Sequence, residues 1–245
     1  MRIKSLVIGY VFALALFLFA QRHPNTAQPV GFHAVVDLTS PRVAASAAGN
    51  GEVTGSIRRQ KEDVAARQSS ETRLDAPATL ATGLWTVDQI PPERLIAPLV
   101  VLDVSDSVKK NPDYLLSVMD IAKWERTHGE IPPGSVVMAR TRATRNDSSS
   151  TPSTVMHSAG YSPDAAKFLI EGRSVVSLGI DSRSVDPGLS KDHPVYRYTL
   201  SRDVYLLENV ADLDRAPAGG GIVMVAPPKL EYGTHAPVRI LALAR

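Results

Sequence analysis

The chain has 245 residues, of which 44% are hydrophobic and 21% charged; this composition is typical of a globular protein and excludes a fibrous or disordered one. The length suits one large α/β domain or two small ones. The formal net charge is +2. Because Arg2 and Lys4 lie in a predicted targeting segment, the rest of the chain is neutral and a nucleic-acid-binding surface is unsupported. The absence of cysteine excludes disulfides, a thiol nucleophile and cysteine-bound zinc.

The N-terminus carries an apolar run behind two basic residues. The run covers residues 6–20, which suits the core of a signal peptide and is short for a membrane span. We expect cleavage after Ala20; an uncleaved anchor is the alternative, because Leu18 is larger than the small residue usual at its position. In both cases a linker at residues 21–34 and a domain at residues 35–245 are expected outside the cytosol, secreted or periplasmic.

The first half of the domain alternates expected strands with loops. A short apolar run at residues 35–38 and a β-branched, nearly continuous run at residues 96–104 predict strands. Residues 72–77 (TRLDAP) alternate in character and are expected to be extended up to the proline. Residues 40–68, rich in Ala, Ser, Gly and Arg, predict a long loop with a helical piece near residues 61–67.

The second half adds helices. Asp120 is expected to cap a helix that ends at Gly129, and Ser162–Asp164 (SPD) predicts the start of another, which runs to Ile170. A further short helix is expected to begin within residues 205–210. The remaining strand candidates are residues 136–139, 174–180, 221–226 and 238–244, with a Ser/Thr/Pro-rich surface loop at residues 146–153. The pattern predicts an α/β domain with a strand-rich core.

The segment at residues 69–80, SSETRLDAPATL, is the most informative part of the chain. With other short segments, its LDAP core resembles the cyclase superfamily of bacterial kynurenine formamidases and isatin hydrolases. The other segments are TVDQIPPERLIAPLVVLDVS (86–105), NPDYLL (111–116), IPPGSVV (131–137), SVDPG (184–188), LEN (207–209) and APVRILAL (236–243). The resemblance covers residues 35–245. It implies a single swivelling β/β/α domain, a dimer or tetramer, and hydrolysis of amides or lactam-like rings.

The resemblance also implies a metal site. The family motif H-x-G-T-H-x-D-x-P-x-H, completed downstream by a His and a Glu twelve residues later, holds Zn²⁺ or Mn²⁺ with a position open for water. Asp75 and Glu208 stand at the two retained ligand positions. The four histidine positions are substituted by Ser69, Arg73 and Tyr196 among the ligands and by Thr79 at the proton-transfer position. Two carboxylates without imidazole make a poor zinc site, so a lost metal site and no cofactor are expected.

Arg73 is the substitution with the clearest physical consequence. In an extended segment, residues 73 and 75 project from the same face. A guanidinium there supplies the positive charge that a metal would have supplied. We hypothesise that Arg73 pairs with Asp75 and with Glu208; the alternative is that Arg73 points into solvent.

The sequence is compatible with three functions. The first is a pseudoenzyme that binds a small anion, such as an aryl acid, in a pocket with Arg73, His157 and His193. The second is a hydrolase of an N-formyl or cyclic amide that uses Zn or Mn in an altered site. The third is a metal-free catalytic set of Thr79, Tyr196 and Arg73, which lacks a group to activate Thr79.

Other motif fragments are weak. Gly233–His235 (GTH) copies a piece of the family motif without its Asp, and we interpret it as a coincidence. Gly219–Gly221 precedes a strand instead of opening a helix, which argues against a phosphate-binding loop. No G-x-S-x-G elbow is present, so serine hydrolase chemistry is unsupported.

Overall fold

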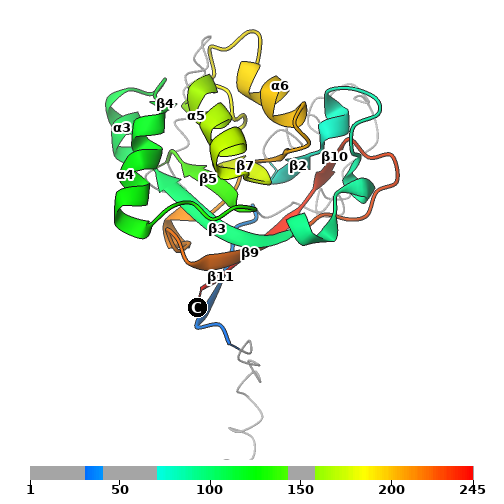
Figure 1. Cartoon of the computed structure of the whole chain (residues 1–245), viewed down its shortest axis with the longest axis horizontal. Coiled ribbons are helices and arrows are strands. Elements are labelled where there is room, and N and C mark those ends of the chain that lie inside the picture. Colours follow the sequence, from blue (N-terminus) through cyan, green and yellow to red (C-terminus); the bar gives the residue numbers. More distant parts are fainter. Residues whose placement is uncertain (1–30, 41–70, 143–157, 245) are drawn as a thin grey trace, which may run out of the picture. The chain divides into compact units, whose positions relative to one another are not determined.

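Within residues 31–40, 71–142 and 158–244, which the computed structural model describes, nine strands form one mixed sheet (Figure 1). These strands belong to a unit of residues 34–245. Outside the described residues lie the predicted targeting segment, most of the linker, nearly all of the long loop, the loop at residues 146–153, Ser69 and His157. Among the residues that are described, no helix has the length and apolar character needed to cross a membrane.

The strand order across the sheet is β1-β11-β9-β3-β5-β7-β8-β2-β10. The central strands β3, β5, β7 and β8 are parallel, and every other neighbouring pair is antiparallel. The strands are β1 (Ala34–Asp37), β2 (Arg73–Asp75), β3 (Ile96–Asp103), β5 (Val136–Arg140), β7 (Ser177–Ile180), β8 (Tyr205–Glu208), β9 (Gly221–Ala226), β10 (His235–Pro237) and β11 (Arg239–Ala244). A separate parallel pair joins β4 (Leu115–Leu116) to β6 (Gly160–Tyr161).

Along the chain, most helices connect one parallel strand of the sheet to the next. The α-helices are α3 (Ser105–Lys110), α4 (Val118–His128), α5 (Pro163–Lys167), which continues as the π-helix η5 (Phe168–Gly172), and α6 (Pro194–Leu200). Single 3₁₀ turns are η2 (Pro77–Thr79), η3 (Val87–Gln89), η4 (Pro92–Arg94) and η6 (Leu213–Arg215).

The sheet separates two hydrophobic cores. Side chains alternate along β3, so Leu99 and Val101 join one core while Val100 and Leu102 join the other. The first core also contains Val36, from the β1 end of the sheet, and residues of the β2–β10 end, which shows that the sheet curls around it. The second core is covered by α4, α5 and α6 (Figure 1). The strand-rich α/β class expected from the sequence is therefore present.

Residues 205–210 do not begin a helix, so that prediction is wrong. Residues 205–208 form β8, which lies between β7 and β2 and is completely buried. The three apolar residues at the start of β8 are too short a run for periodicity to separate helix from strand. Hydrogen bonding to strands on both sides decides the outcome.

Helix α6 was not predicted. Its sequence, PVYRYTL, is rich in β-branched and aromatic residues that weakly disfavour helix. Its first turn is held by a carboxylate from the preceding loop, Asp186, which accepts hydrogen bonds from the backbone N–H groups of Val195 and Tyr196. This long-range cap is absent from the local sequence signal.

The cap of α4 also differs from the expectation. Ser117 is the N-cap residue, and Asp120 lies three positions later, where its carboxylate accepts the backbone N–H of Ser117 at 2.8 Å. Asp120 therefore completes a capping box and is not the cap itself. The expected end at Gly129 is confirmed, since that glycine has φ 88°.

Candidate functional site

Three charged side chains meet where β2 pairs with β8. Arg73 lies directly opposite Glu208 in the antiparallel register, and Asp75 lies two residues further along β2. Because side chains alternate in a strand, Leu74 and Leu207 enter the enclosed core, and the three charged residues share the other face. The sheet itself thus brings together residues that are 135 positions apart.

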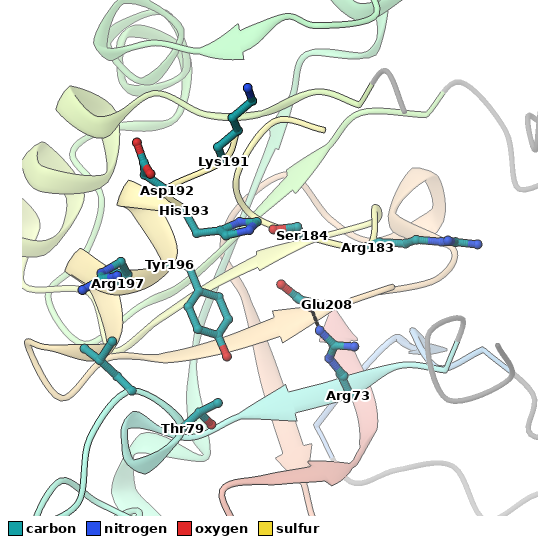
Figure 2. Close-up of a pocket in the computed structure, with 11 residues that line it drawn as sticks. Arg73, Thr79, Arg183, Ser184, Lys191, Asp192, His193, Tyr196, Arg197 and Glu208 are labelled. Atoms are coloured by element: carbon teal, nitrogen blue, oxygen red, sulfur yellow. Dashed lines mark hydrogen bonds and ion pairs between the residues drawn. The ribbon is translucent and has the colours of Figure 1, made fainter. Parts of the chain in front are cut away.

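These residues form an ion-paired group, here named the Arg73 cluster: Arg73, Asp75 and Glu208. Arg73 Nη2 donates to Glu208 Oε2 (Figure 2). Arg73 Nε lies 3.3 Å from Asp75 Oδ1, but it is not aligned for a hydrogen bond, so this contact is electrostatic. The side chains of Asp75 and Glu208 are only 5% and 1% exposed. The contacts are those expected from the alternation in the sequence.

The charges in the cluster are unequal, since one guanidinium faces two buried carboxyl groups. Burial raises the pKa of Glu208 to about 8, against the opposing charge of Arg73 and with the help of Asp75. Burial lowers the pKa of Arg73, but the charges of Glu208 and Asp75 outweigh it and hold that pKa above its ordinary value. Near neutral pH, a proton on Glu208 therefore balances the charge of the cluster.

Tyr196 and Thr79 flank the cluster. The Tyr196 hydroxyl donates to Asp75 Oδ2 at 3.2 Å, and burial, together with Asp75 and Glu208, raises the pKa of Tyr196, so the phenol keeps its proton. The Thr79 hydroxyl donates to the backbone carbonyl of Thr234 at 2.6 Å. That carbonyl also accepts the backbone N–H of Ala76 at 2.8 Å. Thr79 is therefore positioned by the chain that enters β10.

The Gly233–His235 fragment consequently has a structural place beside the site. His235 pairs with Asp75 in the β10–β2 register, while its own side chain is exposed. The fragment acts through its backbone, which anchors η2 and Thr79. The fragment was interpreted as a coincidence because it lacks the motif Asp; its strand pairing with Asp75 could not be read from the sequence.

Asp186 sets the position of α6 above the cluster. The side chain is completely buried, and its two carboxylate oxygens each accept a backbone N–H, from Val195 and from Tyr196, at 2.9 Å. Gly160 packs so tightly against this segment that a Cβ there would lie 2.6 Å from the backbone of Asp186. Asp186 was not predicted as a site residue; the SVDPG segment of the resemblance was its only sequence signal.

A cavity of about 480 Å³ opens beside the cluster. Its lining comprises Arg73, Thr79, Leu80, Arg183, Ser184, Lys191, Asp192, His193, Tyr196, Arg197 and Glu208. His193 lines it as expected, with a left-handed backbone (φ 46°) at the entry to α6, and Asp75 lies behind the lining. The cationic residues Arg183, Lys191 and Arg197 were not predicted, because no motif marks them.

The donor set does not fit Zn²⁺ or Mn²⁺. Within the described ranges, no three His, Cys, Asp or Glu side chains are grouped closely enough to hold a metal ion. The two carboxylates at retained ligand positions are both occupied by Arg73. A guanidinium competes with a metal ion for the same oxygen lone pairs and repels it, whereas zinc sites rely on imidazole or thiolate ligands.

Residues 21–187 match the family model described as "Putative cyclase". The chain belongs to this cyclase family. It is 33% identical over 189 residues to the isatin hydrolase of Roseibium aggregatum, covering 72% of each chain. It is also 34% identical over 77 residues to the kynurenine formamidase of Polaromonas naphthalenivorans, covering 31% of this chain and 34% of the relative.

The solved structures agree with the family assignment. The domain resembles isatin hydrolase A from Labrenzia aggregata, a structure bound to benzyl benzoate, with a TM-score of 0.68 and 28% identity over 86% of this chain and 93% of that chain. The cyclase-like fold expected from the sequence is therefore confirmed. The protein is a cyclase-family relative of isatin hydrolases and kynurenine formamidases.

Proposed function

We propose that this cyclase-family protein binds a small anionic molecule in the cavity without metal-dependent hydrolysis, and that Arg73 stands in for the family metal. The single observation that carries the proposal is the contact of Arg73 with both Asp75 and Glu208. Two carboxylates that would otherwise be costly to bury acquire an internal cation. The cluster is thereby stable with no metal.

The described contacts of Thr79 do not activate it as a nucleophile. Hydrolysis without a metal requires a base that takes a proton from the attacking group. The Thr79 hydroxyl donates a hydrogen bond to the backbone carbonyl of Thr234, which is not a base that could take the proton. A catalytic set of Thr79, Tyr196 and Arg73 therefore has no support from these contacts.

A metal-dependent hydrolase with altered ligands is the second candidate function. It is favoured by the similarity to isatin hydrolase over 72% of the chain. It would require Arg73 to leave the carboxylates, with His193 or His157 as additional ligands. Export through residues 6–20 and assembly into a dimer or tetramer remain proposals that rest on the sequence and on the family resemblance.

Metal analysis of the purified protein tests the proposal. The full-length chain is incubated with Zn²⁺, Mn²⁺ or Ca²⁺, freed of unbound ion and assayed for bound metal and for isatin hydrolysis, with the Roseibium aggregatum enzyme as positive control. We expect no retained metal and no turnover. Retention of near-stoichiometric Zn²⁺ or Mn²⁺ together with hydrolysis would establish the second candidate and overturn the first.

A further inference from the structure

We infer that the cavity binds a molecule with an anionic group at one end and a neutral hydrogen-bonding group at the other, oriented with the anionic end outward. This inference rests on the proposed binding function and specifies its ligand. It depends on the contrast between two parts of the cavity lining. By burial, the floor is Arg73, Glu208 and Tyr196, with the exposed Thr79 beside it, and the rim is the exposed cations Arg183, Lys191 and Arg197.

The positive charge of the floor is already compensated by acidic groups. Arg73 is the cation of the floor, and it contacts two carboxylates, Glu208 in the lining and Asp75 behind it. An anion placed there would compete with Asp75 and Glu208 for Arg73, and the Asp75 carboxylate would repel it. The Tyr196 and Thr79 hydroxyls, in contrast, can each accept a hydrogen bond from, or donate one to, a neutral amide, carbonyl or hydroxyl group.

The rim carries the unpaired positive charge. Within the described part of the chain, Arg183, Lys191 and Arg197 form no ion pair and are exposed. Figure 2 shows the three side chains around the Arg73–Glu208 pair, with their charged ends directed away from it. One acidic residue, Asp192, lies next to these cations in the lining. The rim thus attracts an anionic group that the floor rejects.

The size and lining of the cavity limit the ligand further. A volume of about 480 Å³ lies in the range of pockets that hold small organic molecules. Leu80 and the ring of Tyr196 add apolar surface to the lining. The ligand class is therefore a small, preferably aromatic, acid with one carboxylate, sulfonate or phosphate group and a neutral polar group at its far end.

Three matched probes test this orientation by calorimetric titration of the full-length protein. They are 4-acetamidobenzoate, its neutral analogue 4-acetamidobenzamide, and terephthalate, which is anionic at both ends. We expect the mono-acid to bind about tenfold more tightly than either analogue, since several exposed ion pairs together contribute about that factor. The affinity of the mono-acid is expected to fall with added salt, because rim charges are screened.

Rim variants identify the charges responsible. In the double variant Arg183→Gln/Arg197→Gln, the advantage of 4-acetamidobenzoate over its amide is expected to shrink to about twofold, while the amide binds as before. Arg126→Gln is the matched control, because Arg126 is an exposed cation on α4 outside the lining. This control should keep the full tenfold preference.

Three results would overturn the inference: equal binding of the acid and the amide, tighter binding of terephthalate than of the mono-acid, or no measurable binding of any probe. The metal assay on the same preparation separates these results from failure of the proposed function. Absence of metal with equal binding of acid and amide refutes the orientation alone. Stoichiometric metal with hydrolysis refutes the proposed function, whatever the probes show.

Discussion

Two buried carboxylates near the cavity, Asp186 and Glu208, are held in different ways. Asp186 accepts two backbone N–H groups from the first turn of α6. Glu208 is held mainly by the long side chain of Arg73, with a further backbone N–H from Val185. The first arrangement is fixed by the main chain and orients a helix. The second depends on one partly exposed cation in the lining of a cavity, so it is the arrangement that a ligand can disturb.

The comparison predicts a larger loss of stability at Asp186. An Asp186→Ala change leaves the N–H groups of Val195 and Tyr196 without their acceptor inside the protein, which costs about 3 kcal/mol of unfolding free energy. Urea unfolding measures this loss. Asp164→Ala is the control, because Asp164 is an exposed acid in the first turn of α5 and should contribute less than about 1 kcal/mol. Similar losses in the two variants would contradict the role of Asp186.

Removal of the cation should have a smaller effect. An Arg73→Met variant leaves two buried carboxyl groups without a positive partner, which is expected to cost about 2 kcal/mol at pH 8. The loss is below that for a fully buried pair, because Arg73 is 31% exposed and Glu208 can take up a proton. The loss should therefore shrink at pH 5. A loss that stays constant between pH 5 and pH 8 would show that the side chain contributes packing alone.

The pH dependence of wild-type stability sharpens the same point. Burial, with Asp75, raises the pKa of Glu208 from 4.5 to about 8, although Arg73 opposes the shift. The folded state therefore favours the protonated carboxyl. This contribution to stability is complete below pH 4.5 and is lost as the pH rises toward 8. Glu208→Gln removes the titration, so the stability of wild type relative to this variant should fall across that window. A flat difference would refute the raised pKa.

The Arg73 cluster was accessible from sequence because it depends on local alternation in β2 and on two carboxylates at recognisable positions. Helix α6 and the rim were not accessible, since Asp186 caps the helix from a distant part of the preceding loop and Arg183, Lys191 and Arg197 meet only after the chain folds. The error at β8 has the same origin: neighbouring strands, not local propensity, decide the structure of residues 205–208.

Tyr196 connects the two arrangements, and its variant is expected to have the smallest effect. Its backbone N–H is bound by Asp186, and its hydroxyl donates to Asp75 at 3.2 Å. Tyr196→Phe keeps the helix cap and removes only the side-chain hydrogen bond, with an expected loss of about 1 kcal/mol. Tyr198→Phe on the same helix is the control, because the hydroxyl of Tyr198 donates to the exposed Glu171 and should contribute less.

A double-mutant cycle of Tyr196→Phe with Asp75→Asn separates the contact from general effects on the helix. Residues in direct contact are expected to couple by about 0.5 kcal/mol or more. The same tyrosine change combined with Asp164→Ala, on a different helix, should be additive. If Tyr196→Phe couples to the Asp75 change and not to the Asp164 change, the hydroxyl of Tyr196 links the stability of α6 to the Arg73 cluster. Additivity in both cycles would mean that Asp186 positions the helix without any contribution from the cluster.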